Sequence, residues 1–320
     1  MLNVSRKNNT ETITAKVSKF FNLVRKDFKR NKGLYLMILP VLAYYIVFHY
    51  APMYGLVIAF KDFQPVKGIT GSEWVGLQHF KEFFQSFYFW RILKNTLVIS
   101  CTNLLFGFPA PIILALLINE LRNKYFKSAV QSISYMPHFI SLVVVCGLIK
   151  DFTSDAGVIS YIVSLFGGEA TTLLNQAKNF VPIYVGSDIW QSVGWGTIIY
   201  LAALTGIDQE LYEAAQVDGA SKWKQTLNIT LPGIMPTIII MLVLRMGSML
   251  SVGFEKIILL YNPAVYSTAD VISTFVYRKG LQDFAFSYSA AVGLFNSVIN
   301  FLLLVTANKL SKKYSESSLW

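Results

Sequence analysis

Residues 213–232 read EAAQVDGASKWKQTLNITLP, and they lie between two long apolar runs. The segment is polar and helix-forming, and Gly219 offers a turn between two short helices predicted over 208–217 and 220–229. Pro232 opposes a simple continuation of the second helix into the next apolar run. A helix pair of this kind is typical of a surface that docks on another protein. The alternative is an interfacial helical loop that has no docking role.

The rest of the chain has the composition of a membrane protein. Its 320 residues are 54% hydrophobic, 15% aromatic and only 14% charged. Six apolar runs are each near or above the ~20 residues that cross a bilayer as a helix. The predicted spans are 34–60, 92–118, 130–149, 181–204, 234–260 and 290–307. We therefore predict an all-α membrane protein with six transmembrane helices, a transmembrane domain over 34–310, a connecting loop at 205–232 and a tail at 311–320.

The basic residues set the predicted orientation of the spans. Residues 1–33 carry nine of the 28 lysines and arginines, and others lie at 122–127, 222–224 and 309–313. All of these segments fall on one side of a six-span chain, so both termini and the loop at 205–232 are expected in the cytoplasm. The net charge of +10 follows from this topology, and no nucleic-acid partner is expected.

The segment 1–33 is predicted to be a basic amphipathic arm on the inner leaflet, because apolar residues recur at helical spacing between 17 and 28. A positive flank without helical structure is the alternative. Cys101 and Cys146 fall within predicted spans, and the three histidines are isolated in sequence, so neither a disulfide nor a metal site is predicted.

The motif in the loop resembles that of a known family. The residues that carry the resemblance are Glu213, Ala214, Ala215, Gly219, Ile229, Leu231 and Pro232. Their spacing is similar to that of the cytoplasmic loop in permease subunits of binding-protein-dependent ABC importers. Further matches to the carbohydrate-uptake branch lie at 52–55, 59–63, 74–77, 218–220, 262–263, 269–274, 277–278 and 293–297. The chain looks like the subgroup that moves oligosaccharides or polysaccharide fragments.

The resemblance implies the type I ABC importer permease fold with cytoplasmic coupling helices, in a bacterial cell membrane, and it implies that the seven residues named above couple the chain to ATPases. It also implies several partners: a second homologous permease subunit, two cytoplasmic ATP-binding subunits and an extracellular lipid-anchored sugar-binding protein. The chain itself is then expected to be a transport subunit and not an enzyme. It contains no Gly-x₄-Gly-Lys-Ser/Thr loop, so we expect no bound cofactor, and ATP is expected to be used by the partner subunits.

Polar residues inside the predicted spans are candidates for the carbohydrate path. Arg245 lies near the middle of the span 234–260, where a guanidinium is costly unless it faces water or a partner. We expect it to line the passage, to pair with a carboxylate or to snorkel. Asp188, Gln191 and Trp195 recur at i, i+3 and i+7, so they share one helix face. Aromatic and polar groups together suit a sugar, and interhelical hydrogen bonding is the alternative.

Asn296 and Asn300 lie one turn apart in the last predicted span. They are interpreted first as interhelical hydrogen-bonding residues and second as residues of the path. Two other functions are compatible with a polytopic protein, an ion-coupled secondary transporter and a channel. The first favours intramembrane carboxylates and repeated halves, and both would leave the loop motif at 213–232 without a role.

Overall fold

The computed structural model describes residues 26–28, 30–168, 171–315 and 318–319. The basic arm predicted over 1–33 lies almost wholly outside these residues. The chain divides into two compact units, Met1–Val57 and Ile58–Trp320.

The first unit is an apolar helix. From Lys32 onward its described residues form α2 (Lys32–Tyr45), the π turn η1 (Ile46–Tyr50) and α3 (Ala51–Met53), and the 3-10 turn η2 (Tyr54–Phe60) follows at the boundary. Lys32–Phe60 is long and apolar enough to cross a membrane, and no residue of α2 is buried. A continuous apolar surface of this size needs lipid or another subunit around it.

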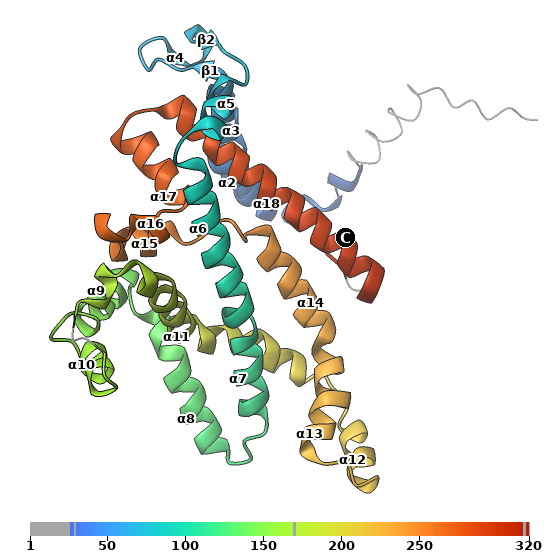
Figure 1. The fold of residues 1–320 in the computed structure, drawn as a ribbon. Helices are drawn as coiled ribbons and strands as arrows, with labels where there is room; N and C mark the ends of the chain where they lie inside the picture. Colours follow the sequence, from blue (N-terminus) through green and yellow to red (C-terminus); the bar gives the residue numbers. More distant parts are fainter. Residues whose placement is uncertain (1–25, 29, 169–170, 316–317, 320) are drawn as a thin grey trace, which may run out of the picture. The chain divides into compact units, whose positions relative to one another are not determined.

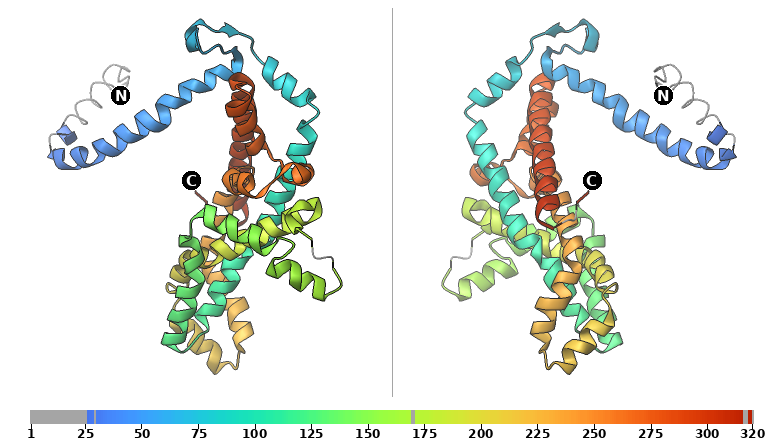
Figure 2. Two further views of the ribbon diagram at one scale, coloured as in Figure 1. Left: turned by 90° about the vertical axis from the view of Figure 1, so that its left-hand side faces the viewer. Right: turned by 90° about the vertical axis from the view of Figure 1, so that its right-hand side faces the viewer.

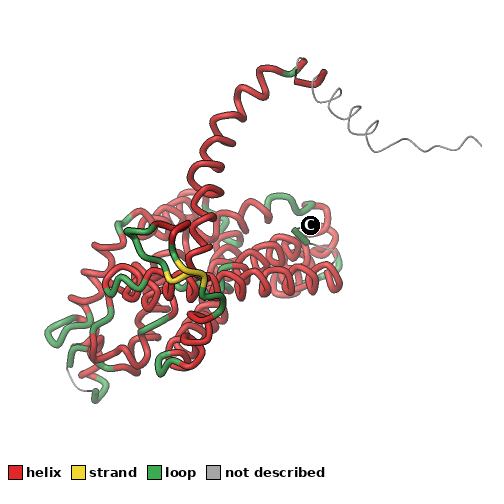
Figure 3. The backbone as a smooth tube through the Cα atoms, turned by 90° about the horizontal axis from the view of Figure 1, so that it is seen from above, coloured by secondary structure: helices red, strands yellow, loops and turns green. Residues whose placement is uncertain are grey.

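The second unit is a bundle of helices with one short hairpin, as Figures 1 and 3 show. Before the first long helix come β1 (Lys61–Asp62), α4 (Gly68–Gly71), β2 (Glu73–Trp74) and α5 (Gln78–Gln85). Then follow α6 (Phe89–Thr102), η3 (Asn103–Gly107), α7 (Pro109–Asn119), α8 (Lys124–Tyr135), η4 (Met136–Phe139), α9 (Leu142–Phe152), α10 (Val158–Leu165) and η5 (Leu173–Asn175). Next are α11 (Ala177–Leu204), α12 (Gln209–Val217), α13 (Lys222–Gln225), η6 (Thr226–Thr230) and α14 (Leu231–Gly247). The last are α15 (Phe254–Leu260), η7 (Pro263–Val265), α16 (Tyr266–Ala269), α17 (Ile272–Tyr277), η8 (Arg278–Gln282) and α18 (Phe286–Ser315). The strands β1 and β2 are antiparallel, with Lys61 opposite Trp74.

Within the described residues, four helices are long and apolar enough to cross a membrane, or five if a bent pair is one span. The four are Lys32–Phe60, Phe89–Asn119, Lys222–Gly247 and Phe286–Lys313. The bent pair is Lys124–Phe139 with Leu142–Phe152, which meet at 97°. The helix α11 has 28 residues, about 42 Å by helical rise. It is not among the four, and it carries the polar residues Asp188 and Gln191 within its length.

Two of the predicted spans differ in structure from a single straight helix. The run 130–149 contains the bend after η4, where Pro137 removes a backbone donor. The run 234–260 is helical only as far as Gly247, and a non-helical stretch at 248–253 separates it from α15. The apolar pattern did not reveal this break, because apolar residues continue on both sides of it.

Three prolines follow π turns in the long helices. The turns η1, η3 and η6 each end two residues before a proline, namely Pro52, Pro109 and Pro232. A proline lacks the N–H of an ordinary helical hydrogen bond and its ring crowds the carbonyl four residues earlier, and a wider turn accommodates both effects. Pro232 therefore does not separate a second short helix from the following span, as the sequence suggested. The chain instead runs as one helical segment from Lys222 to Gly247.

The helix α11 is the centre of the second unit. It packs against α7, α8, α14 and α16, and Figure 2 shows its surroundings from two sides. At its crossing with α8, a Cβ on Gly194 would overlap the carbonyl group of Ser134, so only glycine permits this approach. A buried cluster that includes Ile112, Tyr200 and Ile234 then joins α7, α11 and α14.

Candidate functional site

A chain of polar contacts crosses the interior of the second unit. The Nη2 atom of Arg245 in α14 donates to Oδ1 of Asn103 at 2.9 Å. The other half of the same amide, Nδ2, donates to Oδ2 of Asp188 in α11 at 2.8 Å. The second carboxylate oxygen of Asp188 lies 3.4 Å from Nζ of Lys256 in α15. A cation, an amide, a carboxylate and a second cation thus join α14, η3, α11 and α15.

Lys256 is the most deeply buried member, with 3% of its surface exposed. Its Nζ also donates to the backbone oxygen of Tyr184 at 3.4 Å and lies 5.0 Å from the centroid of that ring. An ammonium group this deep is tolerated only when charge and hydrogen-bond partners replace its water. Asp188 supplies the compensating charge.

Two cavities of the second unit meet at this chain of contacts. Their volumes are about 260 and 370 Å³. Residues that line both are Asn103, Asp188, Arg245 and Ser248. Lys256 lines neither cavity, so the charged groups on the shared wall are Arg245 and Asp188, and the carboxylate of Asp188 is paired with Lys256 behind the wall.

Gly107 makes room for the central amide. A Cβ at this position would overlap Oδ1 of Asn103. Both residues belong to η3, which begins at Asn103 and ends at Gly107. The π turn before Pro109 therefore places the amide at the point where both cavities meet.

The structure brings together only part of the predicted path. Asp188 and Arg245 share both cavities through Asn103. Trp195 lines the larger cavity and stacks on His138, with ring centroids 4.6 Å apart and planes 4° apart. Gln191, although on the same helix, makes a long contact of 3.5 Å to the backbone oxygen of Ile140 and lines neither cavity.

The two asparagines of α18 also lie away from these cavities. Asn300 accepts from the backbone N–H of Leu250 at 2.9 Å and donates to Ser251 Oγ at 2.9 Å, so it joins α18 to the non-helical stretch at 248–253 and not to another helix. Asn296 has a buried Oδ1 without a hydrogen-bond partner in the described structure.

Sequence reasoning missed Asn103 and Lys256. Each is a polar residue within a predicted span, and an ionisable residue at such a position is a functional candidate by default. Asn103 carries no charge, and Lys256 lies four residues from the end of the run 234–260, where a snorkelling lysine is ordinary. Their partners are 85 and 68 residues away in sequence, so spacing could not reveal the contacts.

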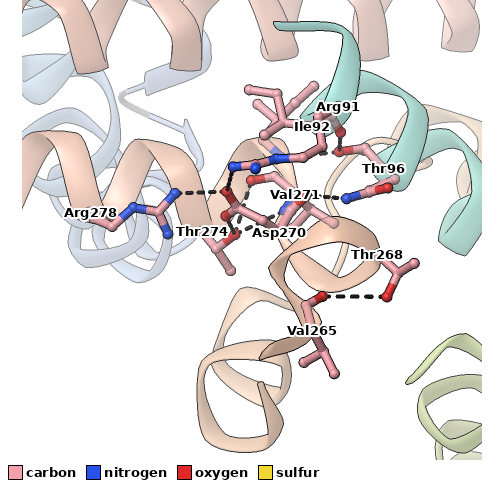
Figure 4. Close-up of polar contacts among 11 residues, drawn as sticks. Arg91, Ile92, Thr96, Val265, Thr268, Asp270, Val271, Thr274 and Arg278 are labelled. Atoms are coloured by element: carbon pink, nitrogen blue, oxygen red, sulfur yellow. Dashed lines mark hydrogen bonds and ion pairs between the residues drawn. The ribbon is translucent and has the colours of Figure 1, made fainter. Parts of the chain in front are cut away.

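A second polar cluster anchors the segment between α15 and α18, as Figure 4 shows. The fully buried Asp270 accepts from Arg278 at 2.7 Å and lies 3.4 Å from Nη2 of Arg91 in α6. Burial lowers the pKa of the Arg278 guanidinium, but its hydrogen bond and ion pair with Asp270 lead to a net rise above the ordinary value. Thr274 donates to the other oxygen of Asp270 at 2.9 Å, so this carboxylate is well satisfied. The cluster fixes α16 and α17 on α6.

The loop that carries the sequence motif forms a second candidate site. Asp208 caps α12 by accepting from the N–H of Glu210, and Ser221 caps α13 by accepting from the N–H of Lys224. Between the helices Gly219 has a φ of +71°, the left-handed conformation that the predicted turn requires. The positions of the remaining motif residues vary: Glu213, Ala214 and Pro232 are exposed, and Ala215, Ile229 and Leu231 are half-buried.

The loop is held on the bundle by its inner side. Tyr212 and Ile229 pack against the cluster of Ile112, Tyr200 and Ile234. The hydroxyl groups of Tyr212 and Thr230 lie 3.0 Å apart. The outer side exposes Leu211, Val217 and Trp223, at 53%, 88% and 71%. An apolar outer face on a firmly attached helix pair is suited to a protein partner.

Comparison with known proteins assigns the chain to a family. Residues 107–316 match the model of the binding-protein-dependent transport system inner membrane component. Protein LplB of Bacillus subtilis (strain 168) is 46% identical over 91% of this chain and 92% of its own. The polygalacturonan/rhamnogalacturonan transport system permease protein YteP of the same organism is 47% identical, over 91% of each chain.

Known structures agree in fold. One is a bacterial ABC transporter involved in the import of the acidic polysaccharide alginate. One chain of that transporter matches this protein with a TM-score of 0.84 and 47% sequence identity, over 91% of this chain and 99% of the transporter chain. The second is the bacterial alginate ABC transporter in complex with an alginate pentasaccharide-bound periplasmic protein. One of its chains matches with a TM-score of 0.85 and 46% sequence identity, over 92% of this chain and 99% of that one.

Replacing Asp188 by alanine is predicted to destabilise the protein through Lys256. The ammonium would stay buried without its charge partner, at a cost of about 3–5 kcal/mol, and the yield of folded protein in detergent should fall sharply. The double variant Asp188→Ala/Lys256→Met should recover most of the yield. Asp283→Ala is the matched control, since it removes the carboxylate of the exposed Lys279 pair, worth about 0–1 kcal/mol. Equal yields of the Asp188 and Asp283 single variants would contradict this account.

Proposed function

The chain belongs to the family of binding-protein-dependent transport system inner membrane components, and we propose that, as the permease of a carbohydrate ABC importer, it moves acidic oligosaccharides or polysaccharide fragments past Asn103, Asp188 and Arg245. Two relatives support this cargo, because one is a polygalacturonan/rhamnogalacturonan transport system permease and the other belongs to a transporter involved in the import of alginate. Within the chain, the observation that carries the proposal is the exposed guanidinium of Arg245 where the two cavities meet, since the one carboxylate there, Asp188, is already paired with Lys256.

The chemistry of this interior suits a uronate-rich saccharide. Arg245 is exposed towards the cavities and has donors beyond the one that contacts Asn103. A guanidinium binds carboxylates in a bidentate manner, and Trp195 offers an aromatic surface for the apolar face of a sugar ring. Neither an ion-coupled transporter nor a channel accounts for this combination with the loop motif at 213–232.

The partners of the proposed complex are those expected for an ABC importer. They are a second homologous permease, two cytoplasmic ATP-binding subunits and an extracellular lipid-anchored sugar-binding protein. One feature supports the need for a protein partner: α12 and α13 expose large apolar side chains. In this arrangement six spans cross a bacterial cell membrane and both termini are cytoplasmic.

The motif loop is proposed to receive the movement of an ATP-binding subunit. Leu211, Val217 and Trp223 offer apolar contact area, and the exposed Glu213 offers a carboxylate to a basic group. The loop cannot yield independently of the bundle because Tyr212 and Ile229 anchor it there. A push on α12 is thus passed to the helix from Lys222 to Gly247.

The cargo is tested by uptake into proteoliposomes that contain the whole importer with its sugar-binding protein. Uptake of a galacturonate oligomer should exceed that of a neutral oligomer of equal length. Arg245→Gln should lower uptake of the acidic oligomer about tenfold, as expected for the loss of one hydrogen bond between charged groups. Assembly with the ATP-binding subunits should be unchanged, because Arg245 contacts an amide and leaves no carboxylate unpaired. Normal acidic uptake by an intact Arg245→Gln complex would contradict the proposed path.

Coupling is tested by charge reversal at Glu213 and by Gly219→Pro. The first removes a carboxylate from the docking face, and the second cannot adopt the φ of +71° that the turn needs. Both variants should insert into the membrane yet lose uptake and receptor-stimulated ATP hydrolysis. Glu73→Lys, an equally exposed charge reversal in β2, serves as the control for Glu213→Lys. Full uptake by both loop variants would overturn the coupling role.

The orientation is tested by cysteine labelling in a background without Cys101 and Cys146. Cysteine at the exposed Ser221 should react only with a membrane-permeant reagent in intact cells. Cysteine at Val66, which is 100% exposed, or at Ser267, which is also exposed, should react with an impermeant reagent. Labelling of position 221 by the impermeant reagent would reverse the proposed topology.

A further inference from the structure

The two cavities that meet at Asn103 follow one another along the same three helices. In α11 the smaller cavity is lined by Tyr184 and Asp188, and the larger by Asp188 and residues further along the helix, as far as Tyr200. Along α14 and the non-helical stretch that follows it the order is opposite, since Met241 lines the larger cavity and residues between Met249 and Gly253 line the smaller one. The residues common to both therefore form a layer between two successive compartments.

An asparagine is unusually well suited to the centre of this layer. Its carbonyl oxygen accepts from a cation and its amide nitrogen donates to an anion, so one neutral side chain satisfies both. Asn103 makes these two bonds, at 2.9 Å to Arg245 and 2.8 Å to Asp188, and is 8% exposed. If the amide were flipped, its NH2 group would face the guanidinium of Arg245 and its oxygen would face the carboxylate of Asp188, and neither hydrogen bond could form. The two neighbours therefore fix one orientation of the amide.

We propose that Asn103 is a positioning residue that closes the passage between the two compartments, and that cargo opens it by replacing the amide as the partner of Arg245 and Asp188. The inference rests on the proposed function, because it assumes that the cargo moves through these compartments. It adds a residue and a role that the motif and the family resemblance do not contain.

The energetics favour a closed layer when cargo is absent. Separating Asn103 from its neighbours leaves a guanidinium and a carboxylate without these hydrogen bonds in a confined space, which is unfavourable unless other groups replace them. A uronate carries a carboxylate that can accept from Arg245 and hydroxyl groups that can donate to Asp188. The cargo thus supplies both replacements, and its differential interaction with the open state shifts the equilibrium.

The backbone around Asn103 is irregular, so the amide can change position here. Asn103 begins the π turn η3, and two prolines follow, at Pro109 and Pro111. The amide fits only because Gly107 has no side chain, since a Cβ there would overlap Oδ1. A methyl group at position 107 should therefore displace the amide while leaving Arg245, Asn103 and Asp188 all present.

The experiment measures ATP hydrolysis by the whole importer in proteoliposomes without binding protein or saccharide. Asn103→Leu removes both hydrogen bonds at similar volume, and Gly107→Ala moves the amide. Each variant should raise this basal rate about tenfold over the unmodified complex, the effect of losing a hydrogen bond to a charged group. Thr102→Val is the matched control: its hydroxyl bonds only to Val98 of its own helix, and it lines neither cavity.

The outcomes distinguish a closing layer from a structural contact. An unchanged basal rate in both variants, or a loss of folded complex in both with no rise in basal rate per complex, would overturn the proposal. Passive leakage of a small anionic dye from the liposomes gives a second measure and should rise with Asn103→Leu and not with Thr102→Val. Because neither readout involves saccharide, failure of the unmodified complex to import a uronate oligomer would count against the proposed function alone.

Discussion

Charge inside an apolar bundle is the constraint on which this structure depends. Lys256 is almost wholly buried, and the carboxylate of Asp188 forms an ion pair with it. The other oxygen of this carboxylate also needs a hydrogen-bond donor, and the amide nitrogen of Asn103 provides it. The amide oxygen of Asn103 in turn accepts a hydrogen bond from Arg245. The polar contacts therefore determine which faces of α11, α14, η3 and α15 are turned towards one another. Apolar packing alone would not select these faces, because each helix is hydrophobic on several sides.

The irregularities of the helices serve this arrangement. A straight α-helix through Pro109 would meet a missing donor and a crowded carbonyl, and the π turn η3 resolves both while presenting Asn103 to the interior. At the crossing of α8 and α11, Gly194 removes the side chain that would keep the helices apart. In both places, residues that weaken a helix in isolation allow a contact in the bundle that a regular helix would prevent.

Much of the architecture was predictable from the sequence, but the interior contacts were not. The apolar runs located the helices, and Gly219 predicted the turn whose φ of +71° the structure shows. The break at 248–253 was missed, because hydropathy does not distinguish one long helix from two short apolar segments. Asp188 and Arg245 were chosen as polar residues in apolar surroundings, yet their common partner lies 85 and 142 residues away from them in sequence. A single sequence does not show which distant residues contact one another. Gln191 and Asn296 were therefore grouped with Asp188 and Arg245 as candidates for the path, because nothing in the sequence distinguishes them.

The helix from Lys222 to Gly247 connects the two candidate sites. At one end it continues from the motif loop, and near the other it carries Arg245, which lies 14 residues after Leu231, about 21 Å by helical rise. Had Pro232 ended the helix, a hinge would separate these sites and movement of the loop would be lost in bending. The π turn η6 instead keeps the segment helical before the proline. In the proposed coupling, a displacement of α12 and α13 would therefore reach Arg245 through one continuous helical segment, and Arg245 meets the rest of the interior through its hydrogen bond to Asn103.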